Sequence, residues 1–120
     1  MNKRKFLKEV FECKTSSVTI PDNFKKIKNS AFMNCTSLTS IVIPNSVKSI
    51  GIDAFMNCTS LTSIVIPDSV TEIGFMAFDG CTSLTDVYYT GTEEQWNAIS
   101  IQYYNDRLTS ATIHYNYKGE

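Results

Sequence analysis

A unit of 23 residues occurs three times in direct succession, and this repeat constrains the fold more than any other feature of the chain. The copies span residues 18–40, 41–63 and 64–86. All three prolines share one position of the unit, and three of the four cysteines share another. Self-similarity at a fixed period in this range is typical of architectures in which equivalent units stack on one another. We therefore predict a solenoid that forms a single domain over residues 1–120.

Each copy predicts a short strand followed by a tight return to the next copy. Leu38, Ile41 and Ile43 have the spacing of a leucine-rich-repeat strand, in which alternate residues face the interior. Pro44 ends that strand, because proline has no N–H to donate to a ladder. The segment VKSI, at residues 47–50, is a candidate for a second short strand.

Two further positions of the unit predict tight turns. The residue before the repeated cysteine is Asn34, Asn57 or Gly80, a series that suits a backbone in the left-handed region. Gly51 and Gly74 mark a second tight position. Because one copy cannot bury its apolar residues alone, the copies must stack, with parallel strands ~4.8 Å apart.

The ends of the array depart from the repeat and predict caps. Residues 1–17 contain a degenerate first copy, and an amphipathic segment at residues 3–12 predicts a short helix over the open end of the stack. Residues 87–120 predict one more strand, a capping box at Thr92–Gln95 that opens a short helix, and a last strand near Ile113. All tyrosines and the only tryptophan lie from residue 88 onward, where they would cover the terminal rung or form an aromatic binding patch.

The pattern LxxIxIPxxVxxIGxxAFxxCxSL covers about residues 11–90 and resembles the BspA-like leucine-rich repeats of bacterial surface proteins. The tail at residues 87–117 also looks like the segment that closes such arrays. The resemblance implies an α/β-type leucine-rich-repeat solenoid that is right-handed, with mostly short parallel strands, turns, and capping helices at both ends. It further implies a role in binding host proteins, matrix or other cells.

The four cysteines, Cys13, Cys35, Cys58 and Cys81, recur once per unit and are expected to form a reduced, buried column. Equivalent side chains of stacked rungs point in the same direction, whereas a disulfide needs Cβ atoms about 3.8 Å apart and suitably directed. Free cysteine is also frequently buried. With one histidine and no CxxC motif, we expect no zinc site and no other cofactor.

Charge is distributed unevenly along the chain. Residues 1–28 hold eight basic and three acidic side chains, whereas residues 29–120 hold three basic and nine acidic ones, so the stack should have a positive and a negative end. The formal net charge of −1 argues against nucleic acid as a partner. No apolar run approaches the ~20 residues of a membrane span. The opening MNKRKF lacks the apolar segment of a signal peptide, so localisation stays open between a cytoplasmic protein and a fragment of an exported one.

No catalytic constellation is recognisable, and we expect no enzymatic activity. Nucleophilic catalysis needs a base within reach of an activated serine or cysteine. The only histidine, His114, falls in the terminal strand among aromatic residues, and we interpret it as a surface residue. Glu93 and Glu94 open a helix, where they complement its dipole.

The outward surface of the main strands is therefore the candidate site for a protein partner. Two columns of outward residues are expected to cross the strands. One column consists of Ser40, Ser63, Asp86 and Ser110, and the other of Thr19, Val42, Val65, Tyr88 and Thr112. Apolar valines at outward positions invite a partner, although valine also simply favours strands. The predicted concave binding face, with Tyr88 at its centre, consists of Ser40, Val42, Ser63, Val65, Asp86, Tyr88 and Thr112.

Two other functions fit the same sequence. A small intracellular inhibitor or regulator would dock on a partner protein through a basic patch at the N-terminal end, made of Lys25, Lys26 and Lys28, and its binding would weaken with salt. An architectural segment would instead stack its positive end on the negative end of another copy and so form a homo-oligomer.

Overall fold

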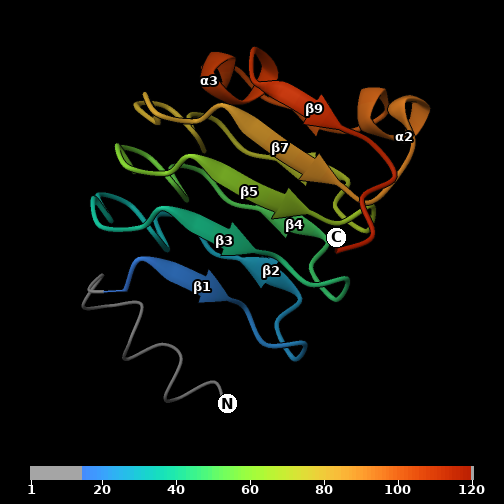
Figure 1. Cartoon of the computed structure of the whole chain (residues 1–120), viewed down its shortest axis with the longest axis horizontal. Helices are drawn as coiled ribbons and strands as arrows, with labels where there is room; N and C mark the ends of the chain where they lie inside the picture. The colour runs from blue at the N-terminus through green and yellow to red at the C-terminus, as the bar shows by residue number, and fades with distance from the viewer. Residues whose placement is uncertain (1–14, 120) are drawn as a thin grey trace.

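The chain folds into a stack of parallel rungs, which the computed structural model describes for residues 15–119 (Figure 1). Two parallel sheets run along the stack. The five-stranded sheet has the order β1 (Ser17–Thr19), β3 (Ser40–Val42), β5 (Ser63–Ile66), β7 (Asp86–Tyr89) and β9 (Thr112–His114). The four-stranded sheet has the order β2 (Lys26–Ile27), β4 (Ser49–Ile50), β6 (Glu72–Ile73) and β8 (Ser100–Ile101). The predicted solenoid is thus confirmed, and β4 lies within the predicted second strand.

Helices are short and occur only in the last rung of the described chain. They are α2 (Glu93–Asn97) and α3 (Asp106–Thr109). The predicted capping box opens α2, since Gln95 N–H donates to the Thr92 hydroxyl (3.2 Å) and Thr92 N–H donates to Gln95 Oε1 (2.8 Å). The predicted helix at residues 3–12 lies outside the described residues.

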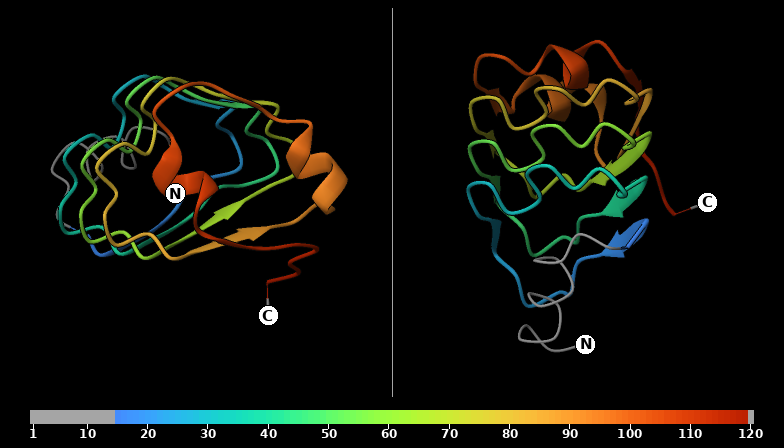
Figure 2. Two further views of the ribbon diagram at one scale, coloured as in Figure 1. Left: turned by 90° about the horizontal axis from the view of Figure 1, so that it is seen from above. Right: turned by 90° about the vertical axis from the view of Figure 1, so that its left-hand side faces the viewer.

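Equivalent residues of successive repeats lie side by side, as the views along and across the stack show (Figure 2). Ile41 pairs with Ile64, and Ile64 pairs with Val87. The repeated leucines, Leu38, Leu61 and Leu84, are buried in the interior. The 23-residue period therefore becomes a set of columns, each formed by one position of the repeat.

Three phenylalanines form the clearest interior column. Phe32, Phe55 and Phe78 stack with ring centroids 5.1 Å apart in each step and with interplanar angles of 5° and 14°. Phe55 is fully buried between its two neighbours. Stacked rings of this kind bury a large apolar area, and the column can form only when adjacent rungs are in register.

The turns place two columns of residues in the left-handed region of the backbone. The predicted one is confirmed, with φ values of 62° at Asn34, 59° at Asn57 and 78° at Gly80. The second column was not predicted and contains no glycine. It consists of Ser30, Asp53, Met76 and Tyr104, with φ values between 56° and 67°. Main-chain hydrogen bonds to the next rung, such as Met76 N–H to Tyr103 O (3.0 Å), hold this corner.

The cysteines do not form the fully reduced column that their spacing predicts. Cys35 is disulfide-bonded, whereas Cys58 and Cys81 are free and buried. Each free thiol donates to the main-chain carbonyl of a phenylalanine in the preceding repeat (3.1 and 3.0 Å). The prediction is wrong at Cys35 because it assumed equal spacing, and the interval from Cys13 to Cys35 is one residue shorter than the period. Cys13 itself lies outside the described residues.

The last rung ends the phenylalanine column with a buried polar residue, Asn105. In the regular rungs, the phenylalanine N–H donates to an alanine carbonyl one rung ahead, as Phe55 does to Ala77 (2.7 Å). The N–H of Phe78 donates instead to Asn105 Oδ1 (3.0 Å), and Asn105 Nδ2 donates to the Gly74 carbonyl (3.0 Å). The side-chain amide therefore takes the place of main-chain groups that a further repeat would supply.

Candidate functional site

The outer face of the five-stranded sheet carries two columns of side chains. The first contains Ser17, Ser40, Ser63, Asp86 and Thr112, and the second contains Thr19, Val42, Val65, Tyr88 and His114. Residues of both columns are exposed or half-buried, whereas the strand residues between them are mostly buried. Val42 is the most exposed apolar residue of these strands, at 40%. All seven predicted residues therefore lie at outward positions, and six of them lie in the column in which the sequence placed them.

Thr112 is the exception, because it lies one column away from its predicted place. It pairs with Asp86, while His114 takes the position beside Tyr88. Ser110, which was predicted to follow Asp86, ends α3 and does not belong to the strand. The cause is the length of the connections in the last rung. Fourteen residues lead from Asp86 to Ser100, compared with nine from the equivalent Ser63 to Glu72, and α2 lies in this longer connection. The connection that contains α3 is two residues shorter than its counterpart, so β9 pairs 26 residues after β7 instead of 23.

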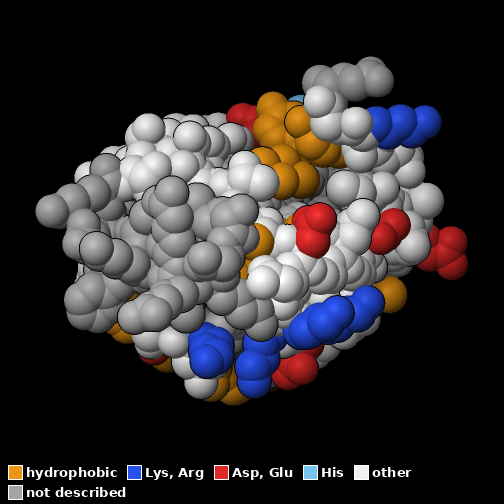
Figure 3. Space-filling view, turned by 90° about the horizontal axis from the view of Figure 1, so that it is seen from below, with side chains coloured by type: hydrophobic (Ala, Val, Ile, Leu, Met, Phe, Trp, Pro, Cys, Tyr) orange, Lys and Arg blue, Asp and Glu red, His pale blue; other side chains and the backbone are white. Residues whose placement is uncertain are grey.

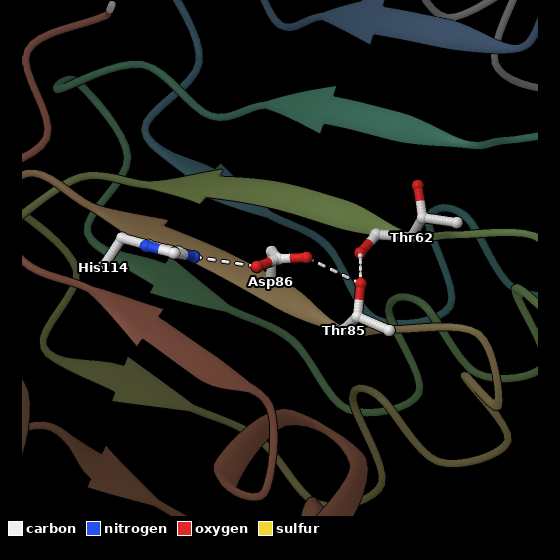
Figure 4. A network of polar contacts seen from close by, with 4 residues as sticks. All are labelled: Thr62, Thr85, Asp86 and His114. Carbon is white, nitrogen blue, oxygen red and sulfur yellow. Dashed lines mark hydrogen bonds and ion pairs between the residues drawn. The ribbon is translucent and has the colours of Figure 1, made fainter.

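A polar network joins the last two strands of this face (Figure 4). Asp86 Oδ1 lies 2.8 Å from His114 Nε2, and Asp86 Oδ2 lies 2.7 Å from the Thr85 hydroxyl. That hydroxyl also lies 3.2 Å from the Thr62 carbonyl in the preceding rung. The hydrogen bond with His114, and then the one with Thr85, lowers the pKa of the Asp86 carboxyl below its usual value. Asp86 is therefore ionised at neutral pH.

Threonines support this network from the rungs below. Thr39, Thr62 and Thr85 occupy one position of the repeat, and each hydroxyl lies within hydrogen-bond distance of a carbonyl 23 residues earlier (2.7, 3.1 and 3.2 Å). These contacts tie neighbouring rungs together along the margin of the sheet. They hold the backbone that presents the first column.

Aromatic rings cluster at the C-terminal end of the second column. The Tyr88 ring stacks on His114 (centroids 4.6 Å apart, interplanar angle 13°) and packs against Tyr117 (4.9 Å, 46°). The sequence predicted the outward position of Tyr88, whereas its two ring neighbours were not predicted as site residues. The aromatic enrichment after residue 88 was the signal that pointed to them.

A groove of ≈ 660 Å³ lies between the C-terminal segment (residues 115–119) and the ends of the strands. The segment is held by a hydrogen bond from Tyr117 N–H to Tyr89 O (2.9 Å), and it extends beyond the outer face of the sheet (Figure 2). The groove lining includes Val42, Val65, Asp68, Tyr117 and Lys118. The two outward valines therefore share a concave, partly aromatic surface with a segment that follows the last strand.

The predicted basic patch lies on the other sheet. Lys26 begins β2, and Lys25 and Lys28 lie immediately before and after that strand. All three side chains are exposed. A view onto the N-terminal end of the stack shows positively charged side chains gathered along one edge, beside hydrophobic and acidic atoms (Figure 3). The structure thus separates the patch from the columns of the five-stranded sheet.

His114 hydrogen-bonds to Asp86, and among the described residues no hydroxyl or thiol bonds to its other ring nitrogen. Residues 15–119 contain no cluster of metal-ligating side chains. No helix in that range is long and apolar enough to cross a membrane. The described residues form two sheet faces, and a groove lies beside the five-stranded sheet and another beside the four-stranded sheet.

Parallel strands stacked at a 23-residue period, with inward leucine and isoleucine columns, define a leucine-rich-repeat solenoid. The family model for the BspA type leucine rich repeat region matches residues 6–118 in six copies. The chain therefore belongs to the BspA-type leucine-rich-repeat family. None of the curated protein sequences is significantly similar to it.

Three solved structures of bacterial leucine-rich-repeat proteins are similar to the chain. A leucine rich cell surface protein from Faecalibacterium prausnitzii shares 39% identity with a TM-score of 0.60, over 71% of this chain and 28% of that one. A leucine rich repeat protein from T. pallidum shares 31% identity (TM-score 0.58), over 62% of this chain and 40% of its own. A leucine-rich repeat protein from Bacteroides ovatus shares 35% identity (TM-score 0.53), over 61% and 23%. The chain thus spans less than half the length of each.

Proposed function

We propose that the chain is a non-enzymatic protein-binding module that acts at a bacterial surface, and that it binds through the outer face of the five-stranded sheet. The observation that carries the proposal is the second column, in which Val42, Val65 and Tyr88 are outward and not fully buried. Tyrosine is enriched among the residues that dominate binding energy at protein interfaces, and the outward valines extend the apolar surface beside it. Asp86 supplies a fixed negative charge beside them.

Two observations support a location at the surface. One similar structure is that of a protein described as a cell surface protein. Cys35 is disulfide-bonded, and disulfides persist mainly in oxidising compartments outside the cytosol. Partners of the kind that the family resemblance implies, such as host proteins, matrix or other cells, are present in the same compartment.

The test uses partners captured on the immobilised chain from bacterial surface extracts and from extracellular matrix, identified and then purified. We expect the triple variant V42A/V65A/Y88A to raise the Kd for such a partner about 100-fold, because each truncation removes roughly 1 kcal/mol of contact energy. The measurement is biolayer interferometry, with thermal unfolding to show that the variant folds.

The matched control is I52A/F75A/Y103A, which truncates three exposed side chains of the same rungs that follow the strands of the four-stranded sheet. Its affinity for the partner should stay within about threefold of the unmodified chain. A partner that binds V42A/V65A/Y88A as tightly as the unmodified chain contradicts the proposed face, and so does the failure of any protein to bind.

A further inference from the structure

A second exposed apolar column lies on the opposite side of the stack, immediately after the strands of the four-stranded sheet. It consists of Ile52, Phe75 and Tyr103, which are 40%, 39% and 75% exposed, and Tyr104 beside them is 67% exposed. The rings of Phe75 and Tyr103 lie 6.1 Å apart. Among the described residues, only Val42 adds to these as a large apolar side chain of comparable exposure. A contiguous exposed apolar surface of this kind marks an interaction site.

A groove of ≈ 590 Å³ runs beside this column, and the backbone of Gly51 and Gly74 forms part of its lining. The glycines are required by the contact between rungs. A Cβ at Gly51 would lie 2.5 Å from Asn29 Oδ1, and one at Gly74 would lie 2.8 Å from Ile52 N. The space in which each Cβ would lie is filled by the preceding rung, so the two glycines allow neighbouring rungs to approach closely. The groove is lined by residues of three successive rungs, from Lys26 to Gly74, and therefore forms a channel along the stack.

Positive charge gathers at the N-terminal end of this channel. Lys26 and Lys28 line it, and Lys25 and Lys48 are exposed beside it. None of these four lysines forms an ion pair with any described residue. Glu72, which also lines the channel, lies two rungs further along. The channel thus begins beside lysines that pair with no acidic side chain of residues 15–119, and its lining ends at Gly74, next to Phe75 of the aromatic pair.

We propose that this channel binds an extended segment of another protein that carries acidic residues followed by apolar ones. The acidic side chains would meet Lys26 and Lys28, and the apolar side chains would pack on Ile52 and Phe75. Four rungs spaced ~4.8 Å apart span ~14 Å, which an extended chain crosses in about four to five residues. This site is separate from the one proposed on the five-stranded sheet.

The charges also favour a peptide over the other two occupants that an apolar, basic surface suggests. Glu72 lies within the lining, where it would oppose an anionic bilayer, whereas a peptide can place an uncharged or basic residue there. In a second copy, residues 93–99 combine acidic and apolar side chains, but they belong largely to α2 and are folded onto their own stack. An extended segment of a different protein fits without unfolding this chain.

The test measures fluorescence polarisation of two labelled peptides with the full chain, DEDGLVFVS and its counterpart KKKGLVFVS. We expect the acidic peptide to bind with a Kd below about 1 mM, at least tenfold tighter than the lysine peptide at low salt, with the difference shrinking as salt rises. The charge-reversal variant K26E/K28E should invert the preference. I52A/F75A/Y103A should weaken binding of the acidic peptide about tenfold, and V42A/V65A/Y88A should leave it unchanged.

Several results would overturn the proposal. They are no binding below 1 mM, equal affinity for the two peptides, or an acidic peptide that binds K26E/K28E as well as the unmodified chain. Co-sedimentation with anionic vesicles that I52A/F75A/Y103A abolishes would assign the channel to a lipid surface instead. A dimer seen in light scattering and lost in the same variant would assign it to a second copy. Because V42A/V65A/Y88A leaves the channel intact, failure here is distinguishable from failure of the proposed partner face.

Discussion

The regular rungs and the last rung satisfy the same backbone groups with different partners. Between regular rungs, the N–H of each phenylalanine bonds to an alanine carbonyl of the next rung. Phe32 bonds to Ala54 and Phe55 bonds to Ala77, both at 2.7 Å. At the last rung, the N–H of Phe78 bonds to the side chain of Asn105 (3.0 Å). A buried N–H without a partner is costly, so the stack can end only where another group replaces the missing repeat. Each repeat supplies hydrogen-bond partners for the neighbouring repeat, and at the end of the array a residue outside the repeat pattern, Asn105, supplies them.

The same contrast holds for apolar packing. In the regular rungs, like residues stack on like, as the phenylalanine rings do. In the last rung, unlike aromatics meet edge to face, with Tyr89 and Trp96 centroids 5.1 Å apart at 70°. Tyr89 is buried there, and this burial raises the pKa of its phenol above the usual value. Substitutions in the regular rungs and in the last rung should therefore destabilise the protein in different ways.

The largest expected effect comes from removing the centre of the regular column. Phe55→Ala leaves a cavity between two stacked rings in a fully buried position, and we expect a loss of about 3–5 kcal/mol of unfolding free energy. Urea denaturation measures it. The matched control is Phe75→Ala, at a site 39% exposed, where the loss should stay below about 1 kcal/mol. Equal losses of unfolding free energy in the two variants would show that the phenylalanine column does not stabilise the regular rungs.

The second effect tests the end of the stack. Asn105→Ala leaves the Phe78 N–H and the Gly74 carbonyl without the side chain that bonds them, and we expect a loss of about 2–4 kcal/mol. Amide hydrogen exchange should accelerate at Phe78 while Phe55 stays protected. Asn97→Ala, at an exposed residue of α2, is the control and should change stability by less than about 0.5 kcal/mol. Unchanged exchange at Phe78 would remove Asn105 from this role.

The contrast between the regions also explains what the sequence could predict. The period places Val42, Val65 and Tyr88 in one outward column, because strands alternate and equivalent positions align. It also locates the second strand and the left-handed turn at Asn34 and Asn57. Each of these follows from residues that repeat. The binding role of the column does not follow from the period, and it stays a proposal.

The misplaced features lie where repetition ends or where the backbone overrides residue preference. The shift that puts His114 beside Tyr88 comes from the longer connection between β7 and β8, which contains α2 and interrupts the period. Met76 and Tyr104 adopt positive φ although neither residue type favours it, since hydrogen bonds between rungs fix the corner. Ile52 and Phe75 lie beside that corner and are exposed, and no periodic pattern in the sequence marks them as exposed.

The smallest expected effect concerns the pair that joins the last two strands, Asp86 and His114. The pKa of Asp86 is lower in the folded chain than the usual carboxyl value of 3.8, first because of His114 and then because of Thr85. A group with a depressed folded pKa stabilises the protein above its unfolded pKa, and that contribution is lost as pH falls through the folded value. Asp86→Asn should therefore lower the Tm at pH 6, and its difference from the unmodified chain should shrink toward pH 3. Asp22→Asn, at an exposed position, provides the control in the same thermal scans. A difference at Asp86 that is equal at both pH values would mean that its charge does not help to hold the last strand in place.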